Sequence, residues 1–240
     1  MLGPRGPATV TLKDDLTNEV SGIFRQAWNE RDGQQVPESA DLGLGKDAVK
    51  LDGTCLYADL ADSTGMVTTK RPTFAAEIYK AFLLCAAKII RSRGGVITAY
   101  DGDRVMAVYI GQQKNRLAVR SALEVNWAIQ EIVTPAMLSR WQDSGFRPAC
   151  AVGVDTSPLF IARTGVRGAN DLVWVGRAAN YAAKLATLRG DHRTYITSDV
   201  YRDLDPSAKL HEGRSMWDAL RWDAHDRSTI YGSAWRWTLS

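Results

Sequence analysis

The spacing of apolar residues predicts alternating helices and strands along most of the 240-residue chain. Apolar residues recur every three or four positions over residues 12–31, 72–93 and 115–138, as in helices that bury one face. Shorter apolar runs at residues 50–60, 96–100, 104–110 and 147–154 predict strands. The resulting order from residue 50 to residue 154 is strand, helix, strand, strand, helix, strand. This order predicts an α+β fold with a ferredoxin-like βαββαβ core.

Two aspartates stand at neighbouring strand ends in this scheme. Asp101-Gly102 is a strong signal for a tight hairpin between the second and third strands. In the ferredoxin-like order the first and third strands are adjacent. We therefore expect Asp59, which ends the first strand, to lie beside Asp103, which precedes the third.

The remaining segments extend this core at both ends. Residues 1–12 are expected to be frayed, and residues 1–48 to form an accessory helix and connector packed on the core or on a partner subunit. Residues 49–240 are expected to form one domain. After the core we predict strands at residues 159–163 and 171–175 around a loop with Gly165 and Gly168, and then a helix over residues 176–188. The C-terminal tail is expected to add a short helix at 199–204 and strands at 194–196, 209–212, 216–221 and 229–235.

Composition narrows the class of protein. A content of 45% hydrophobic and 24% charged residues is ordinary for a globular protein with a full core. The net charge of +3 is too small to indicate nucleic acid or membrane binding, and no run of about 18 apolar residues predicts a membrane span. The start of the chain lacks the apolar middle of a signal peptide. With Cys55, Cys85 and Cys150 in apolar contexts, we expect a cytoplasmic protein with reduced thiols.

The two aspartates suggest metal chemistry. A carboxylate at the end of an apolar strand is poorly solvated, so it is usually paired or bound to a metal. Two such carboxylates suit a site with two divalent cations, which neutralise a triphosphate while one of them activates a ribose hydroxyl. The alternative is that Asp59 and Asp103 only cap turns. Their strand context favours the metal site.

Three ordered sequence blocks resemble the catalytic domain of class III nucleotide cyclases over about residues 50–235. The family has Gly where Asp62 stands and Arg where Lys184 stands. The matching residues are Asp59-Leu60-Ala61-Asp62-Ser63-Thr64, Gly102-Asp103-Arg104-Val105-Met106-Ala107-Val108, and Gly176, Asn180, Ala182 and Leu185.

The resemblance implies a specific site in each chain. Asp59 and Asp103 would hold two Mg²⁺ or Mn²⁺ ions, with the Leu60 carbonyl as an added oxygen ligand. The backbone N–H groups from Ala61 through Asp62 and Ser63 to Thr64 would bind the triphosphate. The ribose 3′-hydroxyl would attack the α-phosphorus, and pyrophosphate would leave.

The resemblance also implies a homodimer with shared sites. Arg177, Asn180 and Lys184 share one helix face, which in the family completes the site of the other subunit. Asn180 would orient the ribose, and Lys184 or Arg177 would neutralise developing charge. Lysine offers a point charge where arginine offers a bidentate fork, which leaves the rate open. Arg221 is the candidate for the phosphate-binding cation that the family carries near its last hairpin.

The base-reading positions favour a pyrimidine. Purine cyclases place polar side chains where this chain has Ala99 and Val173, and neither of these can hydrogen-bond to a purine edge. Tyr57 adds bulk and a hydroxyl, and Arg104 adds donors for a pyrimidine carbonyl. For these two residues a core aromatic and an exposed strand-end charge are equally open interpretations.

Together with the N-terminal segment, these residues resemble the pyrimidine cyclases of bacterial antiphage signalling, which make cyclic UMP or cyclic CMP for a separate effector. We expect UTP to be preferred, with CTP next. A relaxed adenylate cyclase and a catalytically inactive binding module are the alternatives.

Overall fold

A nine-stranded sheet runs through the part of the chain that the computed structural model describes, residues 11–225 and 227–239. Its strands follow the order β10-β11-β7-β5-β2-β4-β3, with β1 also paired to β2 and β6 to β5. The strands are β1 (Asn29–Asp32), β2 (Asp47–Leu60), β3 (Val96–Asp101), β4 (Arg104–Ile110), β5 (Cys150–Val166), β6 (Ala169–Val175), β7 (Thr194–Thr197), β10 (Asp218–Trp222) and β11 (Ser228–Ser233). β8 (Leu210–His211) and β9 (Arg214–Ser215) form a separate two-stranded sheet.

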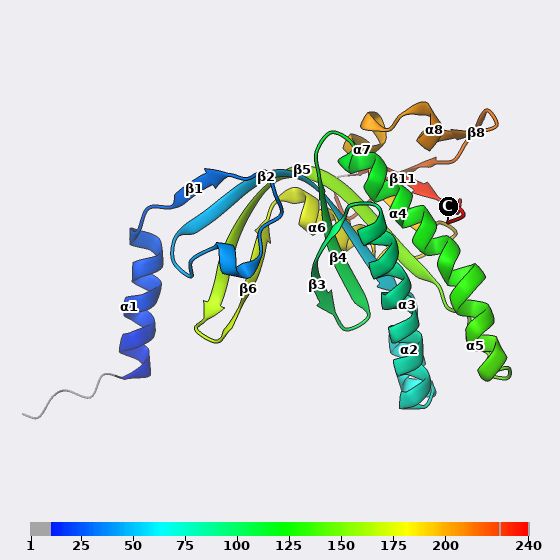
Figure 1. The fold of residues 1–240 in the computed structure, drawn as a ribbon, viewed down its shortest axis with the longest axis horizontal. Coiled ribbons are helices and arrows are strands. Elements are labelled where there is room, and N and C mark those ends of the chain that lie inside the picture. Colours follow the sequence, from blue (N-terminus) through cyan, green and yellow to red (C-terminus); the bar gives the residue numbers. More distant parts are fainter. Residues whose placement is uncertain (1–10, 226, 240) are drawn as a thin grey trace, which may run out of the picture.

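The helices cover the two faces of the sheet unequally. The longest, α3 (Pro72–Ser92) and α4 (Lys114–Ala128), pack on one face, and α6 (Arg177–Leu185) packs against β2 and β5 on the other (Figure 1). The remaining helices are α1 (Leu12–Arg25), α2 (Ser63–Thr69), α5 (Thr134–Arg140), α7 (Ser198–Asp203), α8 (Pro206–Lys209), a 3₁₀ turn (Ser39–Asp41) and a π turn (Ile129–Val133). No helix within the described residues is long and apolar enough to cross a membrane.

Strand alternation divides β2 between two cores. Leu56, Ala58 and Leu60 are buried under α3 and α4, whereas Cys55 and Tyr57 belong to the core under α6. Successive side chains on a strand point to opposite faces, so Asp59 lies on the α6 face. The central order β5-β2-β4-β3 confirms the predicted α+β fold with a ferredoxin-like core.

A glycine sets the distance between α6 and the sheet. A Cβ atom at Gly153 of β5 would lie 2.1 Å from the Ala182 carbonyl oxygen and 2.7 Å from the Ala186 nitrogen. Only glycine therefore allows the α6 backbone to come so close to β5.

The N-terminal helix is shorter than the apolar pattern predicts. It ends at Arg25, Gln26 is extended, and β1 pairs in parallel with the start of β2. Trp28, which fits the helical period, instead packs edge-on against Phe160 with ring centroids 5.0 Å apart. Pairing with β2 outweighed the local helical pattern in this segment. Of the residues expected to be frayed, 1–10 lie outside the described part of the chain.

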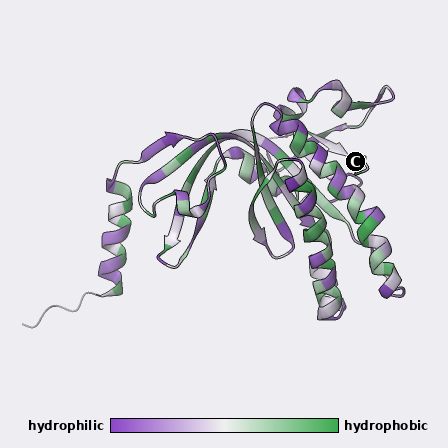
Figure 2. Ribbon diagram, in the orientation of Figure 1, coloured by the Kyte–Doolittle hydropathy of each residue, from purple (hydrophilic) through white to green (hydrophobic). Residues whose placement is uncertain are grey.

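Helix α1 buries none of its residues against the rest of its own chain. Apolar and polar residues alternate along it, and it stands apart from the sheet (Figures 1 and 2). Its large apolar side chains are between 49% and 84% exposed, namely Leu12, Leu16, Val20, Ile23 and Phe24.

Several other boundaries differ from those predicted. Helix α2 directly follows β2 and was not predicted. The predicted helix 115–138 is divided into α4, the π turn and α5, with Pro135 in the first turn of α5. The predicted strands 147–154 and 159–163 form one continuous strand, β5, because it pairs with β2 along nearly its whole length. In the tail, α8 and the small β8–β9 hairpin replace the single strand predicted at residues 209–212.

Candidate active site

The two aspartates predicted to hold metals lie on neighbouring strands. β2 and β4 are antiparallel, with Asp59 opposite Arg104. The Leu60 N–H donates a hydrogen bond to the Asp103 carbonyl oxygen at 3.3 Å. The end of β2 and the turn before β4 therefore meet, and they bring Asp59 and Asp103 together.

The charge of Asp59 is only partly compensated. Its side chain accepts a hydrogen bond at Oδ2 from Arg189 Nη2 at 3.3 Å, and Arg104 Nε lies 3.9 Å from Oδ1. Burial raises the pKa of Asp59, the hydrogen bond from Arg189 opposes this rise, and the charge of Asp103 adds to it. Asp103 Oδ2 is buried and has no hydrogen-bond partner within the described part of the chain. A buried carboxylate oxygen without a donor is costly unless a ligand satisfies it.

These residues fit a divalent cation that is completed by its substrate. Within the described residues, no group of three or more His, Cys, Asp or Glu side chains could hold a metal ion. Mg²⁺, however, is commonly held by one or two carboxylates together with substrate phosphates and water. Asp103 Oδ2 has no hydrogen-bond partner among the described residues, so the pair suits such an ion.

The loop after β2 leads directly into the start of α2. Asp62 adopts the left-handed conformation (φ 56°, ψ 28°), which explains why glycine is usual there. The Ala61 N–H already donates to the Ala149 carbonyl oxygen at 2.8 Å. Ser63 and Thr64 begin α2, where N–H groups lack acceptors within the helix. Of the predicted phosphate donors, Ala61 is thus occupied by sheet pairing.

The α6 residues expected to complete a site do not reach it in their own chain. Asn180 and Lys184 are exposed, and Lys184 Nζ lies 3.0 Å from His225 Nε2. In the described part of the chain, no hydrogen bond or ion pair joins either residue to Asp59 or Asp103. This arrangement is compatible with a role at the site of a second chain.

Arg177 belongs to a different group of charges, which we call the Asp155 cluster (Asp155, Arg177, Thr197 and Asp199). The Arg177 guanidinium donates to both oxygens of the fully buried Asp155, at 3.1 and 3.3 Å, and to Asp199. Thr197 also donates to Asp155. Asp155 pairs with Cys55, four positions from Asp59, or roughly 13 Å along β2.

Two of the predicted base-reading residues flank Met106 from opposite sides, with β4 between them. Tyr57 and Ala99 both pair with Met106 of β4, and burial raises the pKa of Tyr57. Arg104 lies 3.9 Å from Asp59 and 4.0 Å from Asp101, with its side chain 42% exposed.

The other two candidates lie on different strands. Val173 is on β6, opposite Ala162, and is 39% exposed. β6 pairs with β5 and β3 with β4, and both run downward below the arch that β2 and β5 form (Figure 1). Arg221 is exposed on β10, four strands away from β2, or roughly 19 Å across the sheet. A side chain at that distance does not reach Asp59 of its own chain.

Three residues near these side chains could not be predicted from sequence patterns. Arg189 reaches Asp59 from the loop after α6, and His225 contacts Lys184. The pKa of Tyr79 of α3 is raised by burial and by the charge of Asp103, and Ser63 opposes this rise. Each contact joins segments far apart in the chain, and no local motif marks these residues.

Comparisons with known proteins agree with this geometry. No family model matches the chain. It is 50% identical to the uridylate cyclase of Xanthomonas perforans over 95% of this chain and 99% of that protein. It is 49% identical to the uridylate cyclase of Burkholderia cepacia over 96% and 100%, and 36% identical to that of Rhodovulum sp. over 95% and 98%.

Solved structures with the same fold include nucleotide cyclases. The guanylyl cyclase Cya2 superposes with a TM-score of 0.65 at 17% identity, covering 78% of this chain and 94% of that one. The adenylyl cyclase CyaB from P. aeruginosa gives a TM-score of 0.62 at 15% identity, covering 78% and 95%. The chain therefore belongs to the uridylate cyclase family and has the fold of class III nucleotide cyclase catalytic domains.

Proposed function

We propose that this nucleotide cyclase converts UTP, in preference to CTP, into its 3′,5′-cyclic monophosphate and pyrophosphate. The adjacent carboxylates of Asp59 and Asp103, one with an unpartnered buried oxygen, carry the cyclase assignment. The choice of uridine is supported by three relatives named uridylate cyclase, which are 36–50% identical to this chain.

Asp59, Asp103 and the Leu60 carbonyl would hold two divalent cations, Mg²⁺ or Mn²⁺. When bound, such ions neutralise a triphosphate and lower the pKa of a ribose hydroxyl. The chain supplies a buried acid, Asp59, a partly buried acid, Asp103, and a turn, from Asp62 to Thr64, whose N–H groups lie at the start of α2. These donors would hold the triphosphate next to the carboxylates.

The reaction needs a free 3′-oxygen in line with the α-phosphorus. The 3′-oxygen forms the new bond to phosphorus, the bond to the bridging oxygen of the pyrophosphate breaks, and the 3′-proton passes to solvent. Asn180 of a second chain would orient the ribose, and Lys184 of that chain would neutralise the charge developing at the α-phosphate. Arg177 is held by Asp155 and Asp199, so Lys184 is the better placed of the two cations.

Base choice would depend on Tyr57, Ala99, Arg104 and Val173. Ala99 and Val173 offer no hydrogen bond to a purine edge, and a site without such partners loses the large discrimination that paired polar groups give. Tyr57 would fill space at the base, and Arg104 could donate to the O2 carbonyl of a pyrimidine. A second donor contact at position 4 would favour uracil over cytosine.

The product would act as a second messenger for a separate effector in antiviral defence, as in the systems that the chain resembles. Cells that express the chain should accumulate cyclic UMP after phage infection. Infection without any rise in cyclic nucleotide would remove this part of the proposal.

The reaction itself can be tested with purified protein. Each of the four nucleoside triphosphates is incubated with the chain and Mn²⁺, and products are identified by mass spectrometry, with Asp103→Ala as the inactive control. We expect cyclic UMP as the main product and cyclic CMP as the next. Faster turnover of ATP than of either pyrimidine would refute the interpretation of Ala99 and Val173.

A further inference from the structure

Arg189 connects the end of α6 to the metal-site carboxylate. Its Nη1 donates to the carbonyl oxygens of Ala186 and Leu188, at 2.9 and 3.1 Å, while its Nη2 donates to Asp59 Oδ2 at 3.3 Å. One side of the guanidinium is thus held by the backbone, and the other side lies on Asp59. The side chain is 45% exposed, so it borders solvent at the site.

The contact with Asp59 competes with a metal ion for the same oxygen. Asp59 and Asp103 concentrate negative charge in a poorly hydrated place, and in the metal-free chain the cationic Arg189 offsets part of it. A divalent ion on Asp59 Oδ2 would both take the acceptor and repel the guanidinium, since like charges a few ångströms apart interact strongly in a half-buried site. Arg189 must then find another anion.

The triphosphate is the anion available at that place. The guanidinium is planar, and its fork of N–H donors matches phosphate oxygens. Directly across from Asp59 on β5 is Ala151, which is buried and carries no charge. β5 therefore supplies no cation here, whereas β4 supplies Arg104, whose Nε lies 3.9 Å from Asp59 Oδ1, and Arg189 approaches from the loop between α6 and β7. Its bonds to Ala186 and Leu188 keep it within a side-chain rotation of the carboxylates.

We propose that Arg189 is a phosphate-binding residue that exchanges partners, lying on Asp59 in the metal-free chain and on the β- and γ-phosphates of the bound nucleotide. This inference rests on the proposed function. It assigns the phosphate contact to the same chain that holds the metals, whereas Arg221 could contribute only from a partner chain.

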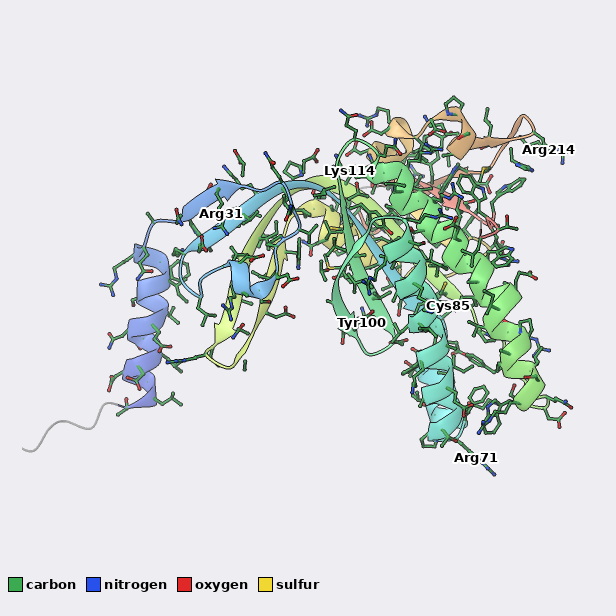
Figure 3. The ribbon with its side chains drawn as sticks, in the orientation of Figure 1. Arg31, Arg71, Cys85, Tyr100, Lys114 and Arg214 are labelled. Atoms are coloured by element: carbon green, nitrogen blue, oxygen red, sulfur yellow. The ribbon has the colours of Figure 1, made fainter. Side chains whose placement is uncertain are left out.

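Binding measurements on the full chain test the exchange without turnover. The variants are Arg189→Ala and Arg189→Lys, with Arg214→Ala as the control. Arg214 is an exposed arginine on the β8–β9 hairpin, far from β2 in Figure 3. Mn²⁺ binding is followed by electron paramagnetic resonance of the free ion. Binding of α,β-methylene-UTP and of UMP, both with Mn²⁺, is followed by calorimetry.

Loss of the competing cation should tighten Mn²⁺ binding of Arg189→Ala about threefold or more in the absence of nucleotide. Loss of the phosphate contact should weaken binding of the triphosphate analogue about tenfold or more. UMP binding should be unchanged, Arg189→Lys should fall between Arg189→Ala and the wild type, and Arg214→Ala should match the wild type.

Two results would overturn the proposal. Unchanged Mn²⁺ and triphosphate affinities in Arg189→Ala would show that the Asp59 contact has no role in the site. Equal losses for the triphosphate analogue and UMP, with a lower Tm, would show that Arg189 only braces the end of α6.

Failure of the proposed function would look different. A wild-type chain that binds an ATP analogue more tightly than the UTP analogue would refute the uridine assignment. The difference between triphosphate and monophosphate binding would then still test Arg189, with the adenine nucleotides as probes.

Discussion

Two groups of buried carboxylates lie on the same face of the sheet, and they differ in how well the protein satisfies them. In the Asp155 cluster, Arg177 and Thr197 donate to the buried carboxylate. In the other group, Asp103 Oδ2 has no partner, and the contacts of Asp59 with Arg189 and Arg104 are 3.3 and 3.9 Å long. Burial raises the pKa of both Asp59 and Asp155. The pKa is raised in both groups, so its direction does not distinguish them. A carboxylate oxygen without a hydrogen-bond donor is what distinguishes a candidate ligand site from a structural ion network.

The largest expected effect separates the two groups by activity. Asp59→Ala or Asp103→Ala should lower cyclase activity about 1000-fold or more, or about 4 kcal/mol of transition-state stabilisation, because each change removes charge from the shared metal site. Stability should be retained, since neither residue is tightly paired. Activity is measured by product mass spectrometry and stability by Tm. Asp52→Ala, at an exposed position on the same strand, is the matched control, and near-normal turnover in either variant would contradict the two-metal assignment.

The second effect separates the groups by stability. Arg177→Met should lower the free energy of unfolding by about 3 kcal/mol at neutral pH, because it leaves the buried Asp155 carboxylate without its cation. Arg202→Met removes a cation that pairs only with Asp199 and is 72% exposed, so it should change stability by about 0.5 kcal/mol or less. Denaturant unfolding measures both. A stable Arg177→Met protein with greatly reduced turnover would instead favour the catalytic role predicted for Arg177.

The loss in Arg177→Met should depend on pH. Burial already raises the pKa of Asp155 above its ordinary 3.8, with Thr197 and Arg177 opposing, and removing the cation raises it further. A group whose pKa is higher in the folded state than in the unfolded state contributes stability that is fully present below the unfolded-state pKa. This stability is lost as the pH rises through the folded-state pKa. The variant should therefore be much closer to wild type near pH 4 than at pH 7. A difference that is the same at both pH values would mean that lost packing, not the unpaired charge, causes the destabilisation.

A smaller effect is expected at Arg104, the second arginine near Asp59. Arg104→Ala should lower kcat/KM for UTP about tenfold through a lost hydrogen bond to the base, a far larger change than in Mn²⁺ binding or dimerisation. The comparison that matters is the ratio of UTP to ATP turnover. An equal fall for both nucleotides would show that Arg104 acts through Asp59 and not through the base.

The smallest expected effect tests whether each group of residues is completed within one chain or by a second chain. The Asp155 cluster is complete within one chain, whereas Asn180 and Lys184 do not reach Asp59 of their own chain. If a two-fold dimer shares its sites, mixing inactive Asp59→Ala and Asn180→Ala chains in equal amounts should restore up to about a quarter of wild-type activity. This follows because half of the dimers are then mixed and each of these has one intact site. No recovery, with subunit exchange demonstrated, would mean that each chain holds a complete site.

Sequence patterns correctly predicted the features that follow from the order of the strands. They failed for features that depend on contacts between residues far apart in the chain. Asp59 and Asp103 could be placed together because the Asp101-Gly102 turn and the order of elements fix β3, β4 and β2. Arg177 was grouped with Asn180 by helical spacing alone, but its partner Asp155 lies 22 residues away in the sequence.

The same limit applies to Arg189 and to the N-terminal segment. Arg189 and Asp59 are 130 residues apart in the sequence, so no periodic pattern of residues predicts their contact. The predicted helix extended past Arg25 because Ala27 and Trp28 fit its period, although pairing with β2 determines the structure there. Sequence patterns therefore gave the carboxylates and the fold, but not the cations around them.

The absence of a side chain at Gly153 has a consequence for communication between active sites. Gly153 pairs with Tyr57 in the sheet, and the backbone of α6 passes close to it. In a dimer with shared sites, the base-binding strand of one site and the helix that completes the other would rest on this single residue. A methyl group there would move α6 away from the sheet and displace Asn180 and Lys184. Activity would then be lost at the active site of the neighbouring, unaltered subunit.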